Sequence, residues 1–497
     1  MTAALSIAFL REYGRRPLNL VLLLVVPLVF VTLSAGALVD FAEVLGGLAD
    51  LGSIEASTAG WAAAVLAGIG GFFQVVGSRA VDRRLAAAGT GTVPVVAARL
   101  MSGFALAMVA SAGSLIALAV RAGIDDVPRT VATTVTFAVI YLGIGAAVGA
   151  VARDELNGSL VVLFIWMFDM FLGPGFTASH APVLRLFPTH YPTLVMLDLD
   201  SGHSSATTDL IISAGWAVAS LTVAAWLLVR TTRPLTPSRS RRMPAALARS
   251  GVALRYAFRQ YRRNVVMWVL LAILPVAFIS LSFVITPEQP AVVQLVESGT
   301  SSLATISMVD VHGAIMAPIT IAFLAGVAGL FVALGSAQAD RRLVLAGFRT
   351  SEVLAARLGV IWAAAIAITA LSLAVTFVDF QPQQPVAFVV ANLLVALTYS
   401  MIGVVLGVAA GRLGGLYLVL TLPFMDLGIA QNVMFDAAPP SWGRLLPAHG
   451  ATRLLVDSAF TSGFDATSSL LVALGWLGAV TVAAVAVFHV LARPAGS

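Results

Sequence analysis

Apolar residues fill long, nearly uninterrupted stretches of the chain, and charged residues gather in short segments between them. Each long stretch has about the 20 residues that a helix needs to cross a bilayer. None alternates with period two, so the pattern predicts helices rather than the strands of a barrel. The twelve predicted spans are residues 18–39, 60–77, 100–121, 130–152, 159–177, 210–230, 265–285, 313–336, 354–378, 386–410, 413–432 and 467–491.

The composition also indicates a membrane protein. Of 497 residues, 59% are hydrophobic and only 11% are charged, whereas a soluble domain has about 25% charged residues. A soluble or disordered protein is therefore excluded, and the predicted fold class is an all-α polytopic membrane protein. Gly143, Gly145 and Gly149 share one span, as expected where membrane helices pack closely.

Arginine supplies all 29 basic residues, and its distribution predicts the orientation. If the N-terminus is cytoplasmic, all but five arginines fall in cytoplasmic segments, and acids such as Asp40 and Glu43 fall on the other side. This positive-inside pattern places both termini in the cytoplasm. We expect a multi-pass protein of the bacterial plasma membrane. Because topology explains the net charge of +5, no nucleic-acid partner is expected.

The motifs of the first half recur in the same order in the second half. A basic segment before the first span, a charged loop between the second and third spans, and an aspartate in the fifth span all return 248 to 260 residues later. The sequence therefore predicts two parallel six-span halves, with a pathway at their interface. Their bounds are 1–230 and 251–497, joined by an Arg/Pro/Ser-rich cytoplasmic linker, 231–250.

The cytoplasmic segments of each half offer surfaces for a soluble partner. Residues 4–16 and 252–264 predict basic helices lying on the membrane surface. The loop after the second span predicts a short helix that docks a partner, although a plain topogenic loop also fits; its candidate residues are Asp82, Arg83, Arg84, Asp340, Arg341 and Arg342. Asp154 and Glu155, in the next cytoplasmic connection, make either a minor contact or a tight turn.

These features resemble the permease family of type-2 ABC exporters, whose loop carries a pattern like DRRLxxxGTxxVP. The resemblance implies a type V exporter fold, an elbow helix, a coupling helix at Asp82–Arg84 and Asp340–Arg342, and two copies of a separate ATPase subunit that bind ATP and Mg²⁺. The chain has no lysine and hence no P-loop of its own. The second copy has Ser351-Glu352 in place of Val93-Pro94, so unequal docking of the two loops is expected.

Two aspartates lie at membrane depth, Asp169 in the fifth span and Asp426 in the eleventh. An unpaired carboxylate is costly in lipid, so each must face a cavity, a partner or an interface. One hypothesis makes them polar elements of a substrate exit path. The other makes each a cap for the short outer segment after its span. A proton-coupled role is less favoured because no Arg or His in other spans completes a relay.

Methionine and aromatic side chains cluster in the second and fifth spans of each half. Flexible Met and flat rings suit a promiscuous apolar site, although core or lipid-facing packing explains any single residue equally well. Together with the aspartates, the predicted substrate pathway comprises Phe72, Phe73, Phe168, Asp169, Met170, Phe331, Phe424, Met425 and Asp426.

The sequence contains no recognisable catalytic or metal-binding motif. The long outer loops 178–209 and 433–466 predict short re-entrant helices, and their His190 and His449 are expected to be structural rather than metal ligands. No nucleophilic triad or HExxH motif is present, so no metal, no resident cofactor and no enzymatic activity are expected.

Two transport functions remain open from the sequence. The favoured hypothesis is the membrane subunit of an ATP-driven exporter for amphipathic or lipophilic compounds, such as drugs, antibiotics or lipids, working by alternating access. The alternative is an ion-coupled secondary transporter, which predicts intramembrane charge relays and broken helices. A membrane enzyme or receptor would need a catalytic cluster or a large soluble domain, and neither is visible.

Overall fold

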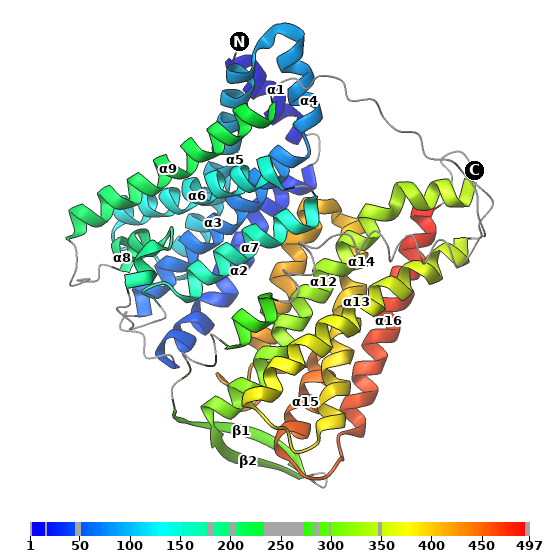
Figure 1. The fold of residues 1–497 in the computed structure, drawn as a ribbon. Coiled ribbons are helices and arrows are strands. Elements are labelled where there is room, and N and C mark those ends of the chain that lie inside the picture. The colour runs from blue at the N-terminus through cyan, green and yellow to red at the C-terminus, as the bar shows by residue number, and fades with distance from the viewer. Residues whose placement is uncertain are drawn as a thin grey trace. The chain divides into compact units, whose positions relative to one another are not determined.

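The protein forms two compact units, Met1–Met243 and Pro244–Ser497, and each is described by itself (Figure 1). The computed structural model describes residues 2–14, 17–44, 51–152, 154–175, 182–197, 205–232, 273–280, 283, 286, 288–297, 300–345 and 350–492. The predicted basic helix 252–264, nearly all of the linker 231–250 and most of the span 265–285 lie outside the described residues.

The regular elements described in unit 1 are all helices. Its helices are α1 (Thr2–Gly14), α2 (Pro17–Val44), α3 (Leu51–Val76), α4 (Arg79–Leu85), the π-helix η1 (Ala86–Thr90), α5 (Thr92–Arg121), α6 (Val127–Val151), α7 (Glu155–Phe171), the 3₁₀-helix η2 (Pro182–Leu186), α8 (His190–Leu197) and α9 (Ala206–Thr232). Helices α1 and α4 are the short helices predicted before the first span and in the charged loop.

Helix α3 forms the centre of unit 1. The protein buries 83% of the apolar stretch of α3, against 17% of the apolar stretch of α9. Helix α3 meets α6 so closely that a Cβ atom at Gly145 would collide with the carbonyl oxygen of Gly68. Close packing of small residues holds helices together in lipid, where the hydrophobic effect does not drive helix association. Peripheral α9 exposes Ile211, Val218 and Trp226, which are apolar side chains suited to lipid.

Unit 2 repeats this helical arrangement and adds a β-hairpin. Its elements are β1 (Pro290–Glu297), β2 (Thr300–Ser307), α12 (Met308–Leu345), α13 (Thr350–Asp379), α14 (Pro385–Pro423), the π-helix η3 (Phe424–Ala430), the 3₁₀-helix η4 (Ser441–Leu445), α15 (His449–Phe460) and α16 (Thr467–Ala492). Helix α12 occupies the centre and packs on α14 through Gly326 and Gly403, which lie 258 residues after Gly68 and Gly145.

Helix α14 reverses direction at Gly411, where φ is 71°. A Cβ atom at Gly415 would lie 3.2 Å from the Cα atom of Gly407. In a straight helix those two residues would be about 12 Å apart, so the chain turns back between them. Glycine permits the left-handed φ, and the two limbs match the predicted spans 386–410 and 413–432.

The hairpin was not predicted from the sequence, which indicated only helices. Strands β1 and β2 pair antiparallel from Pro290 with Ser307 to Glu297 with Thr300. Ala291, Val293 and Leu295 are buried on one face of β1. The signal for a hairpin was present, since a Ser-Gly dipeptide separates two runs rich in β-branched residues.

The described residues confirm a multi-pass, predominantly helical membrane protein. Eight of their helices are long and apolar enough to cross a bilayer, with the two limbs of α14 and η3 counted as one. Helix α7 has 17 residues, slightly fewer than the about 20 that a span needs. Helix α2 has 28 residues and contains the apolar segment Val21–Thr32.

Candidate functional site

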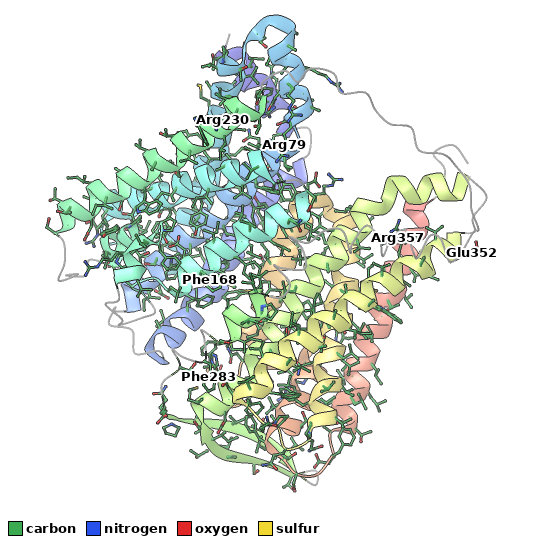
Figure 2. All side chains as sticks on the ribbon, viewed as in Figure 1. Arg79, Phe168, Arg230, Phe283, Glu352 and Arg357 are labelled. Atoms are coloured by element: carbon green, nitrogen blue, oxygen red, sulfur yellow. The ribbon has the colours of Figure 1, made fainter. Side chains whose placement is uncertain are left out.

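The charged loop of unit 1 is anchored by its arginines to the ends of two spans. Arg79 donates a hydrogen bond to the carbonyl oxygen of Gly149 in the last turn of α6. Arg83 donates to the carbonyl oxygen of Thr231 at the end of α9, at 2.8 Å. The last carbonyls of a helix lack intrahelical partners and attract cations, so these contacts fix α4 across the helix ends. Figure 2 shows Arg79 at this end of unit 1.

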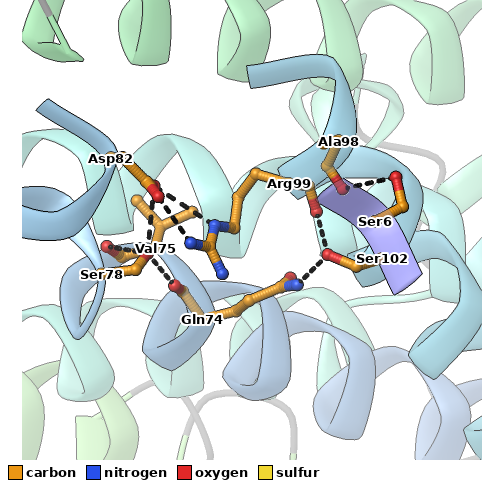
Figure 3. Close-up of polar contacts among 8 residues, drawn as sticks. All are labelled: Ser6, Gln74, Val75, Ser78, Asp82, Ala98, Arg99 and Ser102. Atoms are coloured by element: carbon orange, nitrogen blue, oxygen red, sulfur yellow. Dashed lines mark hydrogen bonds and ion pairs between the residues drawn. The ribbon is translucent and has the colours of Figure 1, made fainter. Parts of the chain in front are cut away.

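Asp82 points into the protein rather than toward a partner. Its carboxylate accepts hydrogen bonds from Arg99 at 2.5 and 3.2 Å and from Ser78 at 3.1 Å. Asp82 and Arg99 are each only 5% exposed. The pair joins α4 to the beginning of α5, so Asp82 contributes to the position of α4 and not to its outer surface (Figure 3).

The outer surface of the loop combines a cation with apolar side chains. Arg84 is exposed, and Val81 and Val93 are 47% and 66% exposed. Gly89 and Gly91 turn the chain between α4 and α5 with φ values of 98° and 77°. Such values favour glycine, which explains the small-residue turn of this motif. The outer surface of the loop is therefore both apolar and basic.

The second copy of the loop has a different backbone. Helix α12 continues through Asp340, Arg341 and Arg342, whereas α3 ends at Val76 before α4 begins. The side chains of these three residues lie outside the described part of the structure. Helices α13 and α5 start at equivalent residues, and Glu352 lies in the first turn of α13. Figure 2 labels Glu352 and Arg357 on this helix.

Asp154 and Glu155 begin helix α7. The Asp154 carboxylate accepts hydrogen bonds from the backbone N–H and the side-chain amide of Asn157, at 2.8 and 2.7 Å. An aspartate at this position satisfies a free N–H of the first turn. Glu155 lies in that turn, where the helix dipole favours an acid. This geometry is that of the tight turn, the second of the two interpretations drawn from the sequence.

Asp169 holds a short helix against the bundle. Its carboxylate accepts the hydroxyl of Tyr141 at 2.6 Å and the backbone N–H of Thr189 at 3.1 Å, just before α8 begins at His190. Asp169 is 1% exposed and Tyr141 is fully buried. The contact joins α6, α7 and the N-terminus of α8, and thus has the geometry of the cap.

Asp426 makes the equivalent contacts in unit 2. Its carboxylate accepts the hydroxyl of Tyr399 at 2.6 Å and the backbone N–H of Ala448 at 2.8 Å, directly before α15. Both side chains are buried, at 0% and 1% exposure. Recurrence in both units, at offsets of 257 to 259 residues, identifies an element of the internal repeat rather than a coincidence of packing.

The apolar residues of the predicted pathway divide into two groups by burial. Phe72, Met170, Phe331 and Met425 are buried. The Phe72 ring fills the space above Gly158, where a Cβ atom would collide with it. The remaining three, Phe73, Phe168 and Phe424, are partly exposed. Figure 2 labels Phe168.

Three contacts were not predicted from the sequence. Tyr141 and Tyr399 were not singled out, although their separation of 258 residues matches the repeat. Arg99 belongs to a segment, Ala97-Ala98-Arg99-Leu100, that recurs 258 residues later, but no buried ion pair was predicted for it. A search for polar residues at the common offset would have found all three, because buried polar groups need partners.

The hairpin of unit 2 is fastened to α15 by polar contacts. Arg453 donates to the backbone oxygen and side-chain oxygen of Gln294, at 3.1 and 2.8 Å. Asp457 accepts the backbone N–H of Val296 at 3.3 Å. Burial raises the pKa of Asp457 to about 6, although the Val296 N–H and Arg453 oppose the increase.

The outer histidine of unit 2 makes a direct polar contact. His449 Nδ1 lies 3.1 Å from Gln431 Oε1. Among the described residues, no group of three or more His, Cys, Asp or Glu side chains is placed to hold a metal ion.

Compared with known proteins, the chain matches no family model and no curated protein.

Proposed function

We propose that this protein is the transmembrane permease subunit of an ATP-driven exporter. Its substrates would be amphipathic or lipophilic compounds such as drugs, antibiotics or lipids. The proposal includes twelve membrane-spanning helices in two parallel six-helix halves, a type V-like arrangement, and both termini in the cytoplasm of a bacterium. It rests on the sequence duplication and on the geometry of the α4 loop.

The observation that carries the proposal is the two-sided construction of the α4 loop. Its inner side is fixed by Asp82 and Arg83, through contacts to α5 and α9. Its outer side presents Arg84 with Val81. A surface that must transmit force needs such rigid anchoring, whereas a topogenic loop needs only positive charge. This favours docking of a soluble motor.

The motor must be a separate polypeptide, because the sequence lacks any lysine and therefore a P-loop. Two loops call for two ATPase subunits, each holding ATP and Mg²⁺. Closure of the ATPase pair on ATP would push the α4 loop and its counterpart at Asp340–Arg342, and rock the halves from inward-open to outward-open. Partly exposed Phe73, Phe168 and Phe424 are the best candidates to meet a substrate.

The test compares Arg84→Glu/Arg342→Glu with Arg185→Glu/Arg444→Glu, a matched double charge reversal with one residue in η2 and one in η4. The chain is co-expressed with candidate ATPases, and complex recovery and ATP-dependent transport in vesicles are measured. The loop variant should lose most of both, while the control should retain both. Unchanged recovery and transport in the loop variant would overturn the proposal. Transport of substrate by the isolated chain, driven by an ion gradient without ATP, would also overturn it and would favour the secondary-transporter alternative.

A further inference from the structure

Arg99 occupies a buried position where four helices of unit 1 meet. Its guanidinium pairs with the Asp82 carboxylate of α4 at 2.5 Å, and its Cζ lies 3.7 Å from the centre of the Phe9 ring of α1. A planar guanidinium can form a bidentate pair and stack on a ring at once. Only 5% of Arg99 is exposed. Its guanidinium contacts α4 through Asp82 and α1 through Phe9.

The surroundings of Arg99 join the same elements through further hydrogen bonds (Figure 3). Ser6 of α1 donates to the carbonyl oxygen of Ala98 at 3.3 Å. Gln74 of α3 donates to Ser102 at 2.5 Å, and the Ser102 hydroxyl donates to the carbonyl oxygen of Arg99 at 2.9 Å. The beginning of α5 thus connects α1 on one side with α3 and α4 on the other.

We propose that Arg99 is a positioning residue that sets the position of α4 relative to α1. Removing either partner of a buried ion pair leaves an uncompensated charge that must move toward water. In this cluster, α4 is the shortest of the four helices. Without the Arg99 contact, the hydrogen bonds that the structure describes between α4 and other helices are those of Arg79 and Arg83 at its other side, so we expect it to shift with the unpaired carboxylate. The consequence for coupling rests on the proposed function, because the outer side of α4 is the surface proposed there for ATPase docking.

The sequence repeat supports this assignment independently. Ser78, Asp82 and Arg99 return as Ser336, Asp340 and Arg357, all at an offset of 258 residues. Retention of the serine, the acid and the distant arginine together is not required by a positive-inside loop, which needs only net positive charge.

The natural absence of cysteine allows a direct distance measurement. Exposed Ala8 of α1 and Ala80 of α4 are replaced by cysteine and spin-labelled in the full chain in lipid nanodiscs. The distance distribution is recorded on the folded, monodisperse fraction by double electron–electron resonance. Arg99→Gln should widen the distribution about twofold, because the Asp82 carboxylate is left unpaired.

Two milder variants keep the test decisive if Arg99→Gln does not fold. Arg99→Lys retains the charge but not the planar stacking, and Phe9→Leu removes only the ring. Both should widen the distribution of distances between positions 8 and 80 less than Arg99→Gln does. The control, Arg121→Gln, breaks the exposed ion pair with Glu55 at the other end of α5 and should leave the distribution unchanged. A merely structural role would lower thermal stability without altering the distance in the folded fraction.

Unaltered distributions in both Arg99→Lys and Phe9→Leu would overturn the inference. The distance measurement uses no ATPase, so its result does not depend on whether the proposed function is correct. If the wild-type chain recovers no ATPase, the proposed function fails while the distance result still stands. If the distances respond as expected and an ATPase binds, Arg99→Lys should in addition reduce transport per ATP hydrolysed.

Discussion

At the scale of single residues, Asp169 and Asp426 show how a carboxylate is accommodated within an apolar bundle. Each accepts one tyrosine hydroxyl and one backbone N–H at the start of a short helix. A helix N-terminus carries partial positive charge and free N–H donors, so it stabilises a carboxylate in place of a cation. The same contacts fix the ends of α8 and α15, and the acid therefore connects a span to the next segment of the chain.

Loss of the tyrosine hydroxyl tests this role. Tyr141→Phe leaves the buried Asp169 carboxylate short of one donor and should lower the free energy of unfolding by about 1–3 kcal/mol. Thr136→Val on the same helix removes an exposed hydroxyl that donates to the carbonyl oxygen of Ala132, and should have little effect. Thermal unfolding in detergent compares the two. Equal stability of both variants would show that the hydroxyl does not hold the carboxylate, and would favour the exit-path hypothesis.

At the scale of helices, one glycine contact recurs at the centre of each unit. Gly145→Ala places a methyl group against the carbonyl oxygen of Gly68, so α3 and α6 must separate. We expect destabilisation of about 3 kcal/mol or more, since collision with backbone cannot be relieved by a rotamer change. Gly215→Ala on α9 meets no atom within 4 Å and should be neutral or slightly stabilising. Folded yield and melting temperature are measured, and equal values for the two variants would contradict the close contact.

The hairpin should respond to pH through Asp457. Its pKa is raised from 3.8 to about 6 in the folded protein, so the folded state binds this proton more tightly than the unfolded state. Protonation of Asp457 therefore increases the free energy of unfolding as the pH falls from about 6 to 4. Above that range, the buried carboxylate is charged and lowers the free energy of unfolding. Asp457→Asn keeps an oxygen for the Val296 N–H but cannot titrate.

Melting temperatures of wild type and Asp457→Asn, measured between about pH 4 and 7.5, check this prediction. The variant should lose part of the stabilisation that the wild type gains on acidification. Asp126→Asn, at the N-terminus of α6, serves as the control on another loop. Parallel pH curves for wild type and Asp457→Asn would show that this carboxyl does not link the hairpin to pH.

At the scale of the whole molecule, hydrophobicity and duplication are the two properties that the sequence displays directly. They predict the membrane helices, the short connection between the two limbs of α14 and the short helix α4, through apolar length and charge. The direction of a side chain is not predicted in this way, since it depends on which helices pack together. The prediction for Asp82 therefore did not include its buried contact with Arg99, 17 residues along the chain. The hairpin was missed because the prediction considered only the long apolar stretches, and not the Ser-Gly dipeptide between two short runs of β-branched residues.

Orientation is the remaining whole-molecule property, and single cysteines in this cysteine-free chain can test it. Helix α5, with 30 residues, is about 45 Å long and can place its two ends on opposite sides of a bilayer. Parallel halves require Ala88→Cys and Glu352→Cys to react with an impermeant maleimide from the cytoplasmic side. Ala122→Cys and Leu303→Cys must then react from the other side. All four positions are exposed, so failure to label reflects the membrane rather than burial. Labelling of Ala88→Cys and Glu352→Cys from opposite sides would make the halves inverted repeats. A rocking mechanism driven from two cytoplasmic loops would then be impossible.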